Sequence, residues 1–221
     1  MALAERVHLH MRHVYHRRMY APEQHVPYRA VGPGPGFKPM GSGLRSLFAA
    51  FVAISTLSFV AVIVLWTTAI AVHPERPNDT LMGSGFAFMV AVVFLLYAQI
   101  FTGMGWLYKA WAWLPCNERY TANWRSWITP AQAACFLFIP YFHYYWMFVI
   151  NTGLCDALER LRVRYPTRTP SPKGLAIAAC ICQLIIPLPV GAILWLLYMS
   201  RIEKMTREMA ESAAPGGAPL F

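Results

Sequence analysis

Charged residues along this chain fall in short blocks, and long apolar stretches without any charge lie between the blocks. Four such windows occur, at residues 46–72, 80–108, 126–155 and 174–200. Each exceeds the roughly 20 residues that an α-helix needs to cross a hydrocarbon core about 30 Å thick. The pattern therefore predicts four transmembrane helices at about these positions.

The expected fold is an all-α integral membrane protein whose four helices form two antiparallel hairpins. The loop between the first two windows is short and holds two prolines, so these helices should lie side by side. Residues 44–209 would form the transmembrane domain. A flexible, basic tail rich in His, Pro and Gly (1–43) precedes it, and a disordered C-terminus (210–221) follows.

The third window is the most unusual, because a proline lies near its middle. Thr129 can cap the helix, and Pro130 suits the first helical position. Pro140 removes one backbone hydrogen bond and should kink the helix. A re-entrant hairpin that turns at Pro140 is the alternative. A continuous, kinked helix is preferred because residues 136–147 hold no other turn-forming residue. In the fourth window Pro187 and Pro189 should produce a similar bend.

Few polar side chains interrupt the windows, and these are the candidate functional or polar-core positions. His143 lies close to mid-membrane, where an ionisable group suggests function. If windows three and four are antiparallel helices, counting from their centres places Gln183 level with His143. We expect both to face the bundle interior and to be hydrogen-bonded directly or through one water, with His143 neutral. Gln99, Asn151 and Pro140 complete this set.

Tryptophans crowd the connection between the second and third windows. Rings of this kind gather at the level of the lipid headgroups, where their amphipathic character suits the interface. We expect them to form such an aromatic belt rather than to stack on nucleobases. The residues are Trp106, Trp111, Trp113, Trp124 and Trp127.

Composition supports a membrane protein and gives its orientation. The chain is 57% hydrophobic and only 13% charged, whereas soluble domains are about a quarter charged. A net charge of +9 indicates contact with anionic headgroups rather than with nucleic acid. Basic residues concentrate in the tail, the second loop and the C-terminus, which predicts a multi-pass inner-membrane protein with both termini cytoplasmic. Five basic residues of the third loop oppose this arrangement: Arg160, Arg162, Arg164, Arg168 and Lys173.

Groups that could hold a metal or cofactor are sparse. Four histidines of the tail, His8, His10, His13 and His16, could bind a transition metal weakly if the tail were helical, but no cysteine or paired carboxylate completes the set. The five cysteines are expected to be small packing residues. The sequence predicts no catalytic, cofactor or metal site.

Residues 129–148 carry a motif in which a Thr-Pro start leads to Phe138, Ile139 and Pro140, and then to Tyr145 and Trp146. This stretch resembles a motif of uncharacterised small bacterial inner-membrane proteins with four spans, a domain of unknown function. The resemblance covers about residues 81–200 and implies an architecture but no activity. Those proteins tend to have Asn at the position of His143.

Three functions are compatible with these patterns. A non-enzymatic accessory or scaffold subunit, in contact with itself or with other membrane subunits, fits the absence of a nucleophile–base set, paired carboxylates or a phosphate loop. A small oligomeric transporter or channel could use broken helices in windows three and four. A haem- or quinone-linked redox protein could use His143 as a ligand, but a bis-histidine haem needs a second histidine inside the membrane, and His73 lies at the end of a span.

Overall fold

A computed structural model describes residues 38–72, 79–185 and 189–213 of the protein. The chain divides into two units, 1–34 and 35–221, and all positions given below belong to the second. The predicted tail with its histidine cluster, His73, Pro187 and the extreme C-terminus lie outside the described residues. The elements are α2 (Gly43–Val72), α3 (Asp79–Trp113), η1 (Cys116–Glu118), β1 (Tyr120–Thr121), β2 (Ser126–Trp127), α4 (Pro130–Cys135), η2 (Phe136–Phe138), α5 (Phe142–Arg164), α6 (Lys173–Ile185) and α7 (Pro189–Ser212). The all-α class is confirmed.

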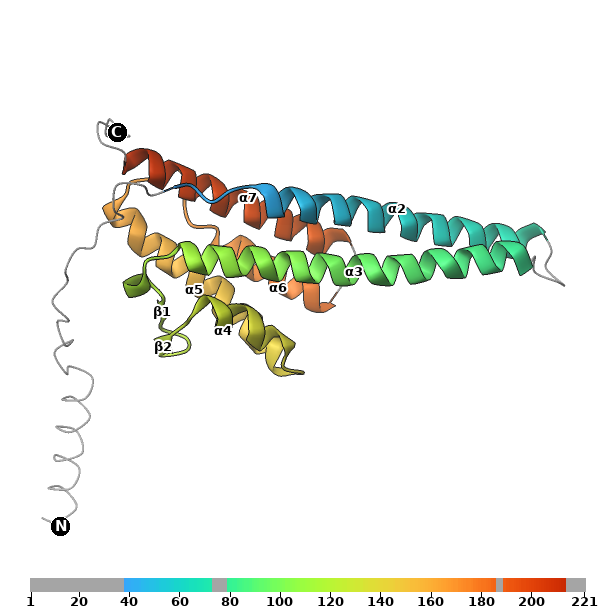
Figure 1. Cartoon of the computed structure of the whole chain (residues 1–221), viewed down its shortest axis with the longest axis horizontal. Coiled ribbons are helices and arrows are strands. Elements are labelled where there is room, and N and C mark those ends of the chain that lie inside the picture. Colours follow the sequence, from blue (N-terminus) through green and yellow to red (C-terminus); the bar gives the residue numbers. More distant parts are fainter. Residues whose placement is uncertain (1–37, 73–78, 186–188, 214–221) are drawn as a thin grey trace, which may run out of the picture. The chain divides into compact units, whose positions relative to one another are not determined.

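Helices α2 and α3 form the long antiparallel hairpin that the first two windows predict (Figure 1). They contain 30 and 35 residues, and both are long and apolar enough to cross a membrane. Gly85 allows close approach between them, because a Cβ there would overlap the indole of Trp66. Closer to the start of α2, Gln99 Nε2 of α3 donates to Ser55 Oγ and to the Phe51 carbonyl of α2.

The third window is not one continuous helix, so the expected kink is wrong. Helix α4 begins at Pro130 behind a Thr129 capping box, as predicted, but η2 ends at Phe138. Ile139 is extended, since a residue before proline is disfavoured in the helical region and Pro140 has no N–H to donate. Tyr141 then takes a positive φ of 61°, and α5 begins at the next residue.

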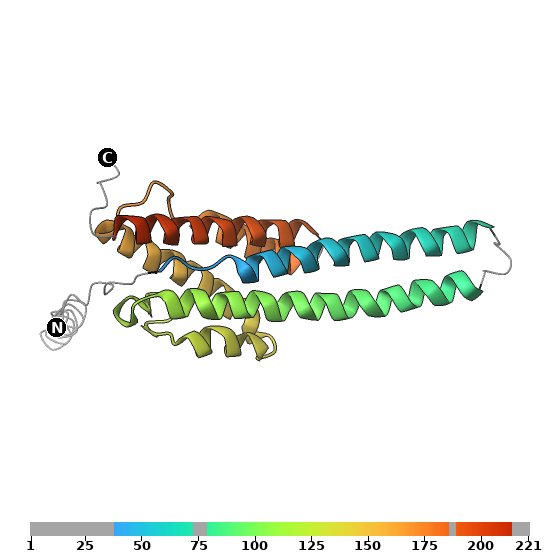
Figure 2. The ribbon, with the colours of Figure 1, turned by 45° about the horizontal axis from the view of Figure 1, so that its top comes forward.

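Helix α5 turns back from this break toward α4 (Figure 2). Trp146, in the second turn of α5, donates its indole N–H to the Ala133 carbonyl at 3.3 Å. Its ring also packs on Phe136, with 5.0 Å between the centroids. The chain therefore reverses at Ile139–Tyr141, as in the re-entrant alternative.

The fourth window also reverses rather than bends. Helix α6 ends at Ile185, and α7 begins with Pro189 at a first helical position, which suits proline. A Cβ on Gly191 would lie 3.3 Å from Gln183 Oε1 and 3.7 Å from the Cys182 carbonyl carbon. In one continuous helix, residues eight apart would be about 12 Å apart along the axis. Four membrane-spanning helices are therefore not confirmed, and α6 counts only 13 residues.

A two-stranded ladder and the hydrophobic core lie beside α5, α6 and α7. They are at the end of the α2–α3 hairpin where α2 begins and α3 ends. In the antiparallel β1–β2 ladder, Tyr120 pairs with Trp127 and Thr121 with Ser126. The core is built from α3, α5 and α7, with contributions from α2 and α6. Its largest fully buried side chains include Trp106, Trp111, Trp146, Tyr198, Leu154, Leu158 and Ile202.

We predict that Gly153→Ala destabilises the protein by about 1–3 kcal/mol, the usual cost of overpacking. A Cβ at Gly153 of α5 would overlap Thr121 Cγ2 and lie 3.6 Å from Trp111 Cη2. This cost should outweigh the gain of about 1 kcal/mol that alanine brings to a helix. Thermal unfolding in detergent measures the effect. Gly174→Ala is the matched control, since no atom lies within 4 Å of the added carbon. An unchanged melting temperature for Gly153→Ala would contradict the close packing of α5 on β1.

Candidate functional site

A buried carboxylate joins three helices near the start of α2. Glu203 of α7 has 2% of its side chain exposed, and Arg45 Nε of α2 lies 2.9 Å from its Oε2. The indole N–H of Trp106 in α3 donates to Oε1 at 3.1 Å. The Arg45 N–H does not point along a hydrogen-bonding direction, so this contact is an ion pair rather than a directed hydrogen bond.

Burial and the neighbouring polar groups have opposite effects on the ionisation of Glu203. The apolar part of α7 ends at Ser200, and Glu203 lies one turn further along the helix. Burial raises the pKa of Glu203, whereas the Trp106 hydrogen bond and the charge of Arg45 favour the ionised form. A buried charge of this kind is stabilising only while its partner is present. The cluster therefore ties α2, α3 and α7 together at one level.

A second ion pair attaches the α3–α4 connection to α5. Arg160 Nε contacts Glu118 Oε2 at 3.0 Å, and Arg160 Nη2 donates to the carbonyls of Glu118 and Tyr120 at 2.9 and 3.0 Å. In the same connection, Asn123 Nδ2 donates to Thr152 Oγ1 of α5 at 3.1 Å. The Arg160 guanidinium and the Asn123 amide therefore hold the α3–α4 connection against α5.

The α5–α6 loop is held against α7 by a third carboxylate. The backbone N–H and the hydroxyl of Thr169 donate to Glu208 at 2.8 and 2.7 Å, and the Thr167 hydroxyl donates to the Thr169 carbonyl. Partial burial acts to raise the pKa of Glu208, but the Thr169 hydrogen bonds and the nearby Lys204 outweigh it, so the pKa lies below its ordinary value. Lys173 and Asp156 bridge α6 and α5 at 2.7 Å.

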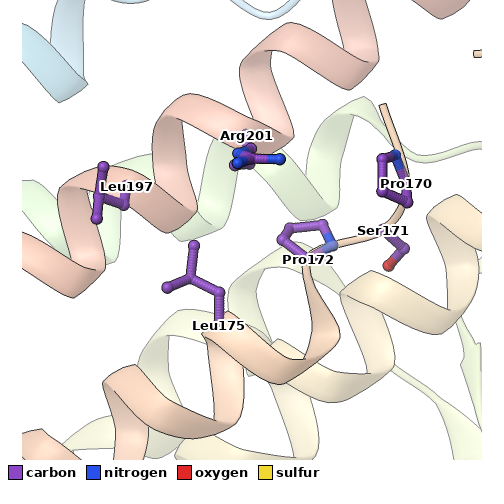
Figure 3. Close-up of a pocket in the computed structure, with 6 residues that line it drawn as sticks. All are labelled: Pro170, Ser171, Pro172, Leu175, Leu197 and Arg201. Atoms are coloured by element: carbon purple, nitrogen blue, oxygen red, sulfur yellow. The ribbon is translucent and has the colours of Figure 1, made fainter. Parts of the chain in front are cut away.

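A shallow pocket of about 330 Å³ lies beside this loop (Figure 3). Leu197 and Arg201 of α7 face Leu175 of α6 across it, and the loop residues Pro170, Ser171 and Pro172 close it. The Ser171 hydroxyl donates to the Cys155 carbonyl. Arg201 is exposed and makes no ion pair with the described residues. The lining can hold an anionic group next to an apolar chain, but it lacks a nucleophile with a neighbouring base.

The predicted pairing of His143 with Gln183 depended on continuous helices, which the chain does not form. His143 is in the first turn of α5, where its ring packs on Tyr144, and Gln183 is in the last turn of α6. Among the described residues no hydrogen bond joins the two side chains, and Gln183 is exposed rather than facing the interior. In the same part of the chain no three His, Cys, Asp or Glu side chains gather closely enough to hold a metal ion.

The other polar candidates are buried, as expected for groups inside a bundle. Gln99 joins α3 to α2 through the hydrogen bonds described above. Asn151 is fully buried, and its Nδ2 donates to the Met147 carbonyl at 2.7 Å. Its Oδ1 has no partner among the described residues. The Tyr198 hydroxyl donates to the backbone carbonyl of Asn151 at 3.4 Å.

The tryptophans do not form a single aromatic belt. Trp106 and Trp111 are fully buried in the core, because α5 and α7 fold back against this part of α3. These two rings therefore pack against other helices rather than facing outward from the bundle. Trp113 is partly buried and donates to the Lys38 carbonyl. Only Trp124 and Trp127 of the five are exposed.

Comparison of the chain with protein-family models, with curated proteins and with solved structures gave no match.

We predict that Arg45→Met destabilises the protein by about 2–4 kcal/mol, because Glu203 would remain buried without its cation. The expected loss is below that of a fully buried pair, since Arg45 is partly exposed. The double variant Arg45→Met/Glu203→Gln should recover most of the loss, because it removes both charges while the new amide oxygen can still accept from Trp106. Melting temperatures of the three variants in detergent give the coupling. Additive losses would show that the two residues do not act as a pair.

The lowered pKa of Glu208 predicts a pH dependence of stability. Its carboxylate contributes stability above the ordinary value of about 4.5, and this is lost as pH falls through the lowered folded-state pKa. Glu208→Gln should therefore reduce stability near neutral pH by about 1 kcal/mol, with a difference from the wild type that disappears at acid pH. Glu211→Gln, exposed on the same helix, is the control. A difference that stays constant with pH would contradict the role of the carboxylate.

Proposed function

We propose that this chain is an integral membrane protein with two crossing helices, α2 and α3, and two hairpins, α4–α5 and α6–α7, that enter the membrane from one side and turn back. The observation that carries this proposal is helix length. The 13 residues of α6 span about 20 Å, and the nine residues of α4 and η2 about 14 Å. Both fall short of a hydrocarbon core of about 30 Å.

The Arg45–Glu203 pair supports a half-membrane depth for the α6–α7 hairpin. Helix α7 runs antiparallel to α2 (Figure 2), and Pro189 precedes Glu203 by about 21 Å of helix. The start of α7 is then level with Phe59, close to the middle of the Gly43–Ala71 candidate span. The turn of this hairpin would lie near the bilayer centre.

Most backbone N–H groups at the tip of α4–α5 are hydrogen-bonded within the turn, which favours a position in lipid. Unpaired N–H groups are costly in hydrocarbon. Here the N–H groups of Ile139, Phe142, His143 and Tyr144 donate to carbonyls within the turn, and Pro140 has none. Of the N–H groups from Ile139 to Tyr144, only that of Tyr141 donates to no described carbonyl. Its side chains are apolar and exposed, with Tyr141 87% exposed. The residues of the family-like motif, Phe138 to Pro140, form this tip, and we propose that the resemblance concerns such a hairpin.

The distribution of basic residues supports the same topology. In a four-span arrangement the five basic residues of the α5–α6 connection would lie opposite the tail and the C-terminus. With two re-entrant hairpins, every one of the 19 Lys and Arg residues except Arg76 lies on the side of the two termini. Positive charge marks the cytoplasmic side of an inner membrane. Both termini are then cytoplasmic, next to anionic headgroups.

Within this topology we propose a non-enzymatic scaffold or accessory subunit, in contact with itself or with other membrane subunits. The charged groups described above support this, since Glu203, Glu118, Glu208 and Asp156 each join one helix or loop to another. The Arg201 pocket offers binding chemistry for a headgroup phosphate rather than a reacting pair.

Single cysteines read by a membrane-impermeant maleimide separate the three possible topologies. Asn78→Cys lies between α2 and α3, Arg168→Cys between α5 and α6, and Ala213→Cys after α7. We predict that, over the background of the parent chain, Arg168→Cys and Ala213→Cys are labelled from the same side of sealed vesicles and Asn78→Cys from the other.

Two outcomes would overturn the proposed topology. Four crossing helices place residue 168 with residue 78 and opposite residue 213. One re-entrant hairpin followed by a crossing helix places residue 213 with residue 78. Detergent-solubilised samples, in which all three sites are accessible, control for reactivity.

A further inference from the structure

The described helices are unevenly distributed along the α2–α3 hairpin. Near the start of α2 and the end of α3, α4 packs on α3 and α7 packs on α2, while α6 packs on α5 and α7. Phe101–Phe138 and Trp106–Tyr198 are examples of the ring contacts that α3 makes with η2 and α7. Beyond the level of Phe59, α2 and α3 are the only described elements. Their large side chains are exposed there, while Val62, Ala69 and Val92 are buried. Exposed examples are Val60, Ile63, Val64, Ile70, Phe86, Phe88, Val90, Val93 and Phe94.

We propose that the protein acts as a wedge in the leaflet on the side of its termini. It prefers membrane in which that leaflet is convex, and at high density it produces such curvature. The inference rests on the topology proposed above. A helix with its side chains is about 10–12 Å wide and occupies roughly 80–110 Å² in the membrane plane. Four additional helical segments enlarge the cross-section in the cytoplasmic leaflet by several hundred Å², relative to the two helices in the opposite leaflet. A body that is wider in one leaflet fits best where that leaflet is convex.

A wedge bends a membrane only if its parts cannot rearrange to equalise the two leaflets, and the contacts of this chain resist such rearrangement. Glu203 fixes α7 to α2 and α3, and Arg160 fixes α5 to the α3–α4 connection. The tip of α4–α5 is closed by a γ-turn, in which the Phe142 N–H donates to the Pro140 carbonyl at 2.6 Å. A turn with a positive φ at its central residue is strained and rare, and it holds the reversal tight.

Two residues at opposite ends of α5 are equally exposed and therefore give a matched pair of variants. One is the N-cap of the helix, and the other lies in its last turn. Tyr141 at the tip is 87% exposed, and Val163 near the other end of the helix is 88% exposed. In the proposed topology Tyr141 lies in hydrocarbon and Val163 in water. Tyr141→Asp should therefore expel the tip, because a carboxylate is disfavoured in the bilayer interior. Val163→Asp adds the same charge outside the membrane. Aspartate also tolerates the positive φ of position 141 better than most residues.

The test measures sorting between vesicles of different diameter. Protein labelled with a fluorophore at Ala213→Cys is reconstituted into vesicles of one phosphatidylcholine–phosphatidylglycerol mixture and a broad range of sizes. An impermeant quencher distinguishes molecules with outward termini from those with inward termini. We expect outward molecules to be several-fold denser in small vesicles than in large ones, with no such enrichment for inward molecules. Val163→Asp should sort as the parent does, and Tyr141→Asp should lose most of the enrichment.

Other outcomes overturn the inference. Equal density at all diameters, with maleimide labelling as proposed, contradicts the wedge and leaves the topology standing. A second copy that fills the opposite leaflet would give this result. Enrichment that persists in Tyr141→Asp, when gel filtration shows an intact fold, contradicts the role of the α4–α5 hairpin. Labelling of residue 168 from the side of residue 78 overturns the topology and the wedge together.

Discussion

The backbone does not continue as a helix through Ile139, Pro140 and Tyr141, and much of the arrangement of the chain depends on this break. Because α5 returns toward α4, its buried face meets α3 and α7 rather than continuing through a bilayer. The same reversal places the loop that contains Thr169 beside the C-terminal part of α7, where Glu208 binds it. A chain of similar composition with an unbroken third helix would bring none of these groups together.

The apolar segments could be predicted from the sequence, but the direction of the chain within them could not. A charge-free window measures how much of a segment is compatible with hydrocarbon. It does not report whether one helix or two short ones fill the window. For α2 and α3, which hold no proline, one continuous helix fills each window, and α3 continues beyond it to Trp113. Pro140 was identified, but one missing hydrogen bond predicts only a kink. The positive φ of Tyr141 completes the reversal, and a tyrosine gives no sequence signal for that conformation.

The same limit explains which parts of the candidate site could be predicted. Gln99 was expected inside the bundle, and it lies there because its own helices are continuous. Trp106 and Trp111 were assigned to a belt because they follow a span, whereas the fold-back of α5 and α7 covers them. Glu203 lies in a stretch that reads as an amphipathic tail after the last window. A signal was present, since Ile202, Met205 and Met209 place an apolar face beside this carboxylate, but its partner Arg45 is 158 residues away in sequence.

The contacts that hold the helices together differ between the two ends of α2–α3, and this difference has a mechanical consequence. Near the loops, ion pairs and a buried aromatic core join several helices, so a displacement of one helix is resisted by the others. Past the level of the Ser55–Gln99 contact, two helices rely on side-chain packing such as Trp66 against Gly85. Packing between two helices in lipid is weaker than packing in a multi-helix core, because lipid tails are as apolar as the side chains they replace. The end of the hairpin near Arg45 is therefore the more constrained one, and in the proposed topology the far end can adjust to the thickness of the membrane around it.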